Sequence, residues 1–153
     1  MINVYTDGLS TDKFGAFIDE CIIALFPKDA TYSIYFEVEK FIDEDETYDC
    51  ATGAHAGFCI GDDVEAVISL ATHWVYDCGE EVAYEDHELA ANIAHELVHA
   101  KQFCRGQINM IDNVWKHNKK VIDCDSVEYM DLPWEVEAYG YETILTDLLW
   151  ENV

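Results

Sequence analysis

The sequence is poor in the residues that break or loosen a chain. Two prolines and eight glycines stand among 153 residues, half of which are hydrophobic. This composition excludes a collagen-like or disordered class. A chain of this length holds about one domain with a hydrophobic core of its own. We therefore expect a single domain over residues 1–153.

Long apolar runs are also absent. The longest, Cys21 to Phe26 and Ala66 to Ala71, are far too short to span a bilayer. The first residues lack a basic region followed by an apolar stretch, so they do not resemble a signal peptide. These absences predict a cytoplasmic protein that does not bind membranes. We also expect a monomer.

Basic residues are scarce. Eight Lys and Arg face 32 Asp and Glu, which gives a formal net charge of -24. Such a charge repels phosphate backbones, so it argues against a nucleic-acid partner. An acidic surface keeps a protein soluble or suits a salty environment, and it also attracts cationic partners or substrates. Five of the eight basic residues follow closely on one another: Lys101, Arg105, Lys116, Lys119 and Lys120.

The cysteines do not form a close pair. No Cys-x-x-Cys occurs, which argues against a zinc ribbon. Without a secretory signal, we expect mainly free, buried thiols. The six cysteines are Cys21, Cys50, Cys59, Cys78, Cys104 and Cys124.

The first half of the chain carries mostly strand patterns. Alternating β-prone residues predict four strands, and helical spacing of apolar residues predicts one helix between the first two. Asp62-Asp63 is typical of a tight hairpin turn between the third and fourth strands. Asp43 to Thr47 is acidic and is expected to be a solvated loop. The strands are expected at 2–6, 31–38, 57–61 and 65–72, and the helix from 12 to about 27.

The second half favours helices. A helix from about His87 to Cys104 is apolar around much of its circumference, so it should lie buried in the domain. Gly106 to Asp131 is expected to be irregular, and a last helix should start around Asp131-Leu132-Pro133. Together the patterns predict an α+β fold: a small antiparallel sheet packed on the first and central helices, followed by the C-terminal helix. The expected core stripe of that last helix is Trp134, Ala138, Tyr141, Leu145 and Leu148.

One motif on the central helix carries chemistry. In His95-Glu-Leu-Val-His99 the two imidazoles stand four residues apart, about 6 Å along the axis and on one face. That spacing lets both bind one zinc ion. Glu96 is rotated about 100° from His95, so it can accept a proton from a zinc-activated water and deliver it to a leaving group.

A catalytic zinc needs a third protein ligand and an open position. His95-Glu-Leu-Val-His99 followed by Glu135-Val-Glu-Ala138 resembles the minimal gluzincins, small single-domain zinc metallopeptidases, over roughly residues 60 to 145. The resemblance implies that Glu135 is the third ligand and that Glu96 is the catalytic base. Tyr139 stands where that family commonly has an acidic or amide residue that supports a zinc-bound histidine.

Two other residues compete for the position of third ligand. Glu137 lies closer than Glu135 to the expected core stripe of its helix. His117 would make a three-histidine site that resembles SprT-like metalloproteases. Peptide-bond hydrolysis by zinc is thus the leading hypothesis, and a zinc site kept for stability or partner binding is the alternative.

The resemblance also implies where a peptide or protein substrate would bind. Gluzincin-like peptidases hold an extended substrate against an edge strand beside the active-site helix, for which Glu65 to Thr72 is the candidate. Oxyanion stabilisation needs a donor on the open side of the zinc. The possible donors are Tyr129, Tyr139, Tyr141 and His117.

Overall fold

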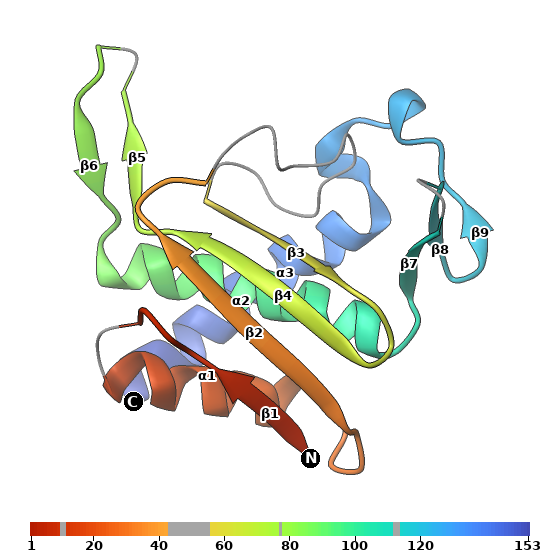
Figure 1. The fold of residues 1–153 in the computed structure, drawn as a ribbon, viewed down its shortest axis with the longest axis horizontal. Coiled ribbons are helices and arrows are strands. Elements are labelled where there is room, and N and C mark those ends of the chain that lie inside the picture. Colours follow the sequence, from red (N-terminus) through yellow and green to blue (C-terminus); the bar gives the residue numbers. More distant parts are fainter. Residues whose placement is uncertain (10–11, 43–55, 77, 112–113) are drawn as a thin grey trace.

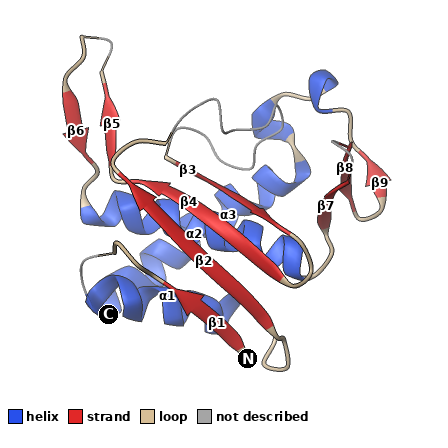
Figure 2. Ribbon diagram, viewed as in Figure 1, coloured by secondary structure: helices blue, strands red, loops and turns tan. Residues whose placement is uncertain are grey.

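The computed structural model describes residues 1–9, 12–42, 56–76, 78–111 and 114–153. Helices and short strands alternate along them, which confirms the predicted α+β class (Figures 1 and 2). The strands of the main sheet are β1 (Ile2–Tyr5), β2 (Tyr32–Glu39), β3 (Gly57–Gly61) and β4 (Glu65–Ala71). The α-helices are α1 (Asp12–Leu25), α2 (Asp86–Cys104) and α3 (Pro133–Leu149).

The main sheet has the strand order β1-β2-β4-β3. The expectation of an antiparallel sheet is wrong for two of its three pairings, because β1 and β2 are parallel and so are β2 and β4. Within this sheet, β3 and β4 are the one antiparallel pair among the described strands, and they form a hairpin. The crossover explains the difference: α1 returns the chain to the starting end of the sheet before β2 begins, so β2 runs beside β1 in the same direction.

The three helices lie on one side of the main sheet (Figure 1). In β2, Ile34 and Phe36 are buried on the helical side, whereas Tyr35 and Glu37 are exposed on the other. Helix α2 contacts β3, β4 and both other helices, so it occupies the centre of the domain. The prediction of a buried central helix is confirmed.

Gly106 to Asp131 was expected to be irregular but contains short strands, and the connection after β4 contains two more. The connection after β4 forms a hairpin, and the segment between α2 and α3 forms a small three-stranded antiparallel sheet (Figure 2). Trp115 is buried there and stacks on Trp134 of α3, which fastens the small sheet to the helix. The strands are β5 (His73–Val75), β6 (Glu81–Ala83), β7 (Ile108–Ile111), β8 (Val114–His117) and β9 (Lys120–Val121), with short 3-10 helices at Cys124–Ser126, Tyr129–Asp131 and Trp150–Asn152. The expected acidic loop at 43–47 lies outside the described residues.

The core stripe of α3 is only partly as expected. Trp134, Ala138 and Leu145 are buried, but Tyr141 and Leu148 are 43% and 62% exposed. The helix therefore packs on α2 over a narrower stripe than its apolar residues suggested.

The cysteines differ in their surroundings. Cys21 and Cys59 are buried as expected, whereas Cys78 is exposed. The expectation of a free thiol is wrong for Cys124, which is disulfide-bonded. Cys50 lies outside the described residues. No helix in the described part of the chain is long and apolar enough to cross a membrane.

Candidate metal centre

The two motif histidines come from the buried middle of α2. His95 is 6% exposed and His99 is fully buried, because the residues around them pack against the sheet and α3. Their Nε2 atoms lie 3.1 Å apart, so both rings turn the same nitrogen toward one point. The helical spacing of four residues produces this convergence.

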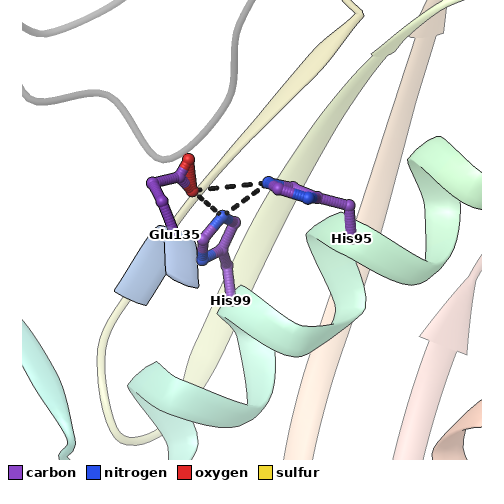
Figure 3. Close-up of side chains that lie close together, drawn as sticks. All are labelled: His95, His99 and Glu135. Carbon is purple, nitrogen blue, oxygen red and sulfur yellow. Dashed lines mark hydrogen bonds and ion pairs between the residues drawn. The ribbon is translucent and has the colours of Figure 1, made fainter. Parts of the chain in front are cut away.

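Glu135 reaches the same point from the first turn of α3 (Figure 3). Its side chain is fully buried, and its Oε1 lies 2.5 Å from Nε2 of His99 and 3.3 Å from Nε2 of His95. Among the described residues, His95, His99 and Glu135 are the group of three ligand-type side chains that could hold a metal ion.

The dimensions of this group suit a small tetrahedral ion. With zinc–ligand distances near 2 Å, tetrahedral ligand atoms lie about 3.3 Å from one another. The His95–His99 and His95–Glu135 separations of 3.1 and 3.3 Å match that value, and the His99–Glu135 separation of 2.5 Å is shorter. The side-chain atoms need only a small movement to accept an ion.

Unsatisfied polar atoms surround the same point. Neither carboxylate oxygen of Glu135 accepts a well-directed hydrogen bond from a described residue, and the same holds for Oε2 of Glu96. Buried polar groups are nearly always paired, and a buried carboxylate without a partner costs several kcal/mol (about 1–3 even for a neutral group). A cation with its coordinated water would satisfy these atoms, so the residues present fit a metal ion.

The pKa values of His95 and Glu135 are shifted in opposite directions by their contact with each other. Burial lowers the pKa of His95, but its contacts with Glu135 and Glu142 outweigh burial and raise that pKa to about 10. Burial raises the pKa of Glu135, but His95 and His99 outweigh it and lower that pKa to about 2. The carboxylate is therefore ionised and, without an ion, has the protonated His95 as its positive partner. A metal ion takes that place when it displaces protons from its ligands.

Glu96 lies beside the group and is 3% exposed. Burial raises its pKa well above the usual range, and the charges of Glu135 and Glu142 add to this although His95 opposes it. A Cβ placed on Gly57 would come within 3.3 Å of the Glu96 Cγ and 2.9 Å of the Ser69 carbonyl oxygen. The beginning of β3 thus passes directly over the Glu96 side chain, and only glycine permits this approach.

Three further residues contact the histidines, and the sequence analysis named only one of them, Tyr139. Gln102 Oε1 lies 2.8 Å from Nδ1 of His99. Glu142 Oε1 lies 3.6 Å from Nδ1 of His95, and the Tyr139 ring meets the His95 ring edge-on at 4.6 Å between centroids. Gln102 could have been found from its spacing, because a residue three positions after His99 shares its helix face.

The two competing ligand candidates are engaged elsewhere. Glu137 Oε1 accepts hydrogen bonds from Lys101 Nζ at 2.7 Å and from Gln102 Nε2 at 3.3 Å. His117 lies in β8 with its ring 6.5 Å from the Trp134 ring. Neither residue belongs to the group that could hold an ion.

Of the four candidate oxyanion donors, two lie near the candidate centre and two contact other residues. Tyr139 contacts His95, and burial followed by the charge of Glu135 raises the pKa of Tyr129, which places both tyrosines beside the candidate centre. The Tyr141 ring instead lies 5.4 Å from the Lys101 ammonium. His117 lies on the small sheet beside Trp134.

The expectation that Glu65 to Thr72 forms an edge strand for the substrate is wrong. Glu65–Ala71 forms β4, which lies between β2 and β3 and so offers no free edge. The edge strand beside the motif helix is β3, the partner of β4 in the hairpin. Sequence pattern located both strands but not their order in the sheet.

Comparisons with protein-family models, with curated proteins and with solved structures find no match to this chain.

Proposed function

We propose that the chain is a zinc-dependent metallopeptidase in which His95, His99 and Glu135 hold the ion and Glu96 is the general base and acid. The observation that carries the proposal is the convergence of two buried imidazoles and one buried carboxylate within 4.8 Å of one another. Two histidines and one glutamate are a donor set of catalytic zinc sites, which keep a fourth position open. Bound there, zinc would supply Lewis acidity and lower the pKa of water.

The proposal gives Glu96 the task of moving protons. Its raised pKa suits a group that accepts a proton from the attacking water and then releases it to the leaving amine. Its Oε2 is free to do so, since no described residue donates a hydrogen bond to it.

Strand β3 supports the choice of an extended peptide as substrate. It is an edge strand of the main sheet, and its first residue, Gly57, lies against Glu96. An extended peptide that adds to a sheet edge is held by main-chain hydrogen bonds and needs no particular sequence. A peptide on β3 would therefore bring its backbone past the group of His95, His99 and Glu135. The net charge of -24 favours basic peptides as the first substrates to test.

Metal analysis tests the first half of the proposal. Wild type purified without chelator should carry one zinc per chain, and His95→Ala and Glu135→Ala should lose it. Glu137→Gln and His117→Ala are matched controls, because neither residue belongs to the group; both should keep one zinc at saturating zinc. Zinc-free wild type, or zinc that stays in Glu135→Ala and leaves with Glu137→Gln, contradicts the assignment.

Hydrolysis of unfolded polypeptides tests the second half. Glu96→Gln should keep its zinc and lose activity by at least about a hundredfold, since general acid–base groups contribute that much or more. A wild type that binds zinc tightly, loses stability on chelation and cleaves no peptide would instead indicate a zinc site kept for stability or partner binding.

A further inference from the structure

The hydrogen bonds behind His99 fix which of its nitrogens carries the proton. Gln102 is 2% exposed, and its Nε2 donates to the Trp134 carbonyl oxygen at 3.0 Å and to Glu137 Oε1 at 3.3 Å. Carbonyl and carboxylate oxygens only accept hydrogen bonds. The reverse orientation of the Gln102 amide would place its oxygen against both of them, so the amide must turn that oxygen toward His99.

The orientation of Gln102 determines which nitrogen of His99 is protonated. Gln102 Oε1 is an acceptor, so Nδ1 of His99, at 2.8 Å, must be the donor. A neutral imidazole with its proton on Nδ1 has its lone pair on Nε2. Nε2 is the nitrogen that faces His95 and Glu135.

We propose that Lys101, Glu137 and Gln102 form a fixed hydrogen-bonded chain that holds His99 as the Nδ1–H tautomer and so act as positioning residues for the metal ligand. The inference rests on the proposed zinc site and gives Glu137 a role other than ligation. Lys101 is 7% exposed, and its ammonium anchors the Glu137 oxygen that also receives the Gln102 amide. Lys101 of α2 and Trp134 and Glu137 of α3 thus restrict the Gln102 side chain to one orientation.

Zinc affinity, measured by competition with a chromophoric chelator, tests the proposal. Gln102→Met keeps the size of the side chain and removes its acceptor, so zinc should bind about 10- to 100-fold more weakly, as for other residues that orient metal ligands. Gln107→Met is the matched control, because it alters the other glutamine of the chain, whose side-chain oxygen accepts no hydrogen bond from a described residue. The zinc affinity of this variant should equal that of wild type. Equal affinity of Gln102→Met and wild type would overturn the proposal.

A second pair of variants separates positioning from folding. Glu137→Met should weaken zinc binding about tenfold, and Glu137→Gln, which retains an acceptor for Gln102, should restore most of the affinity. If both bind zinc as wild type does, the chain does not position His99. This pair also decides the question if Gln102→Met fails to fold.

The ring nitrogens of His99 provide a readout that a purely structural role would not change. Nitrogen-15 NMR of the zinc-loaded wild type should show a protonated, slowly exchanging Nδ1, and that proton should exchange faster in Gln102→Met. A His99 protonated on Nε2, with zinc on Nδ1, would refute the inference while leaving the zinc site intact. If the wild type binds no zinc at all, the proposed function fails, and the Nδ1 proton of zinc-free protein still tests the orientation of Gln102.

Discussion

Replacement of Gly57 by alanine tests the close contact between β3 and Glu96. An added Cβ would lie 2.9 Å from the Ser69 carbonyl oxygen and 3.3 Å from the Glu96 Cγ. The carbonyl belongs to β4, the neighbouring strand of the hairpin, and cannot move without disturbing it. Forcing extra atoms into such a space costs about 1–3 kcal/mol. We expect Gly57→Ala to be destabilised by this amount.

Urea unfolding measures the effect, with two alanine substitutions as controls. Gly15 in α1 and Gly140 in α3 have nothing within 4 Å of an added Cβ. Glycine inside a helix costs about 0.5–1 kcal/mol relative to alanine, so Gly15→Ala and Gly140→Ala should be more stable than wild type by about that much. The opposite sign at Gly57 isolates the steric effect. An unfolding midpoint for Gly57→Ala at or above that of wild type would refute the reasoning.

Two further predictions concern the turn and the thiols. Asp62→Ala should lower stability by about 1 kcal/mol in urea unfolding, because the Asp62 carboxylate accepts hydrogen bonds from the backbone of Val64 and Glu65 in the β3–β4 turn. The control, Asp63→Ala, should change stability by less than about 0.5 kcal/mol. Equal effects of the two substitutions would show that the Asp62 hydrogen bonds do not stabilise the turn. Burial and then the charge of Glu20 raise the pKa of Cys21 to about 12, so iodoacetamide at pH 8 should modify exposed Cys78 and leave Cys21 intact until urea is added. Peptide mass spectrometry measures both thiols, and equal labelling of the folded protein would show that Cys21 is accessible.

The elements of the fold were easier to predict than their arrangement. Alternation of apolar residues marked the four strands of the main sheet, and helical periodicity marked α1 and α2, because burial on one face imposes those periods. Strand direction depends on the connections, and the strand–helix–strand order of β1, α1 and β2 already favoured a parallel pair. The strands of the small sheet, two to four residues long, carry too little pattern to be recognised.

The site shows the same division between local and tertiary information. The spacing of His95 and His99 defines their common face, because helix geometry alone fixes it. The choice between Glu135 and Glu137 could not be derived in that way, since both stand on one helix and only the docking of α3 on α2 decides which side chain points inward. In the structure Glu135 is fully buried beside the histidines, and Glu137 turns toward Lys101.

The candidate ligands lie on two helices, so an ion bound to them would link two distant parts of the chain. His99 lies on α2 and Glu135 follows 36 positions later on α3, with the small sheet between them. An ion held by both would join the two helices as a crosslink does, and would bind only after they have docked. After the disulfide of Cys124 has been reduced, a protease cut within the small sheet would leave the two halves held together by packing and by the ion. Chelation should then release the C-terminal fragment from nicked protein far faster than from the same protein kept in zinc.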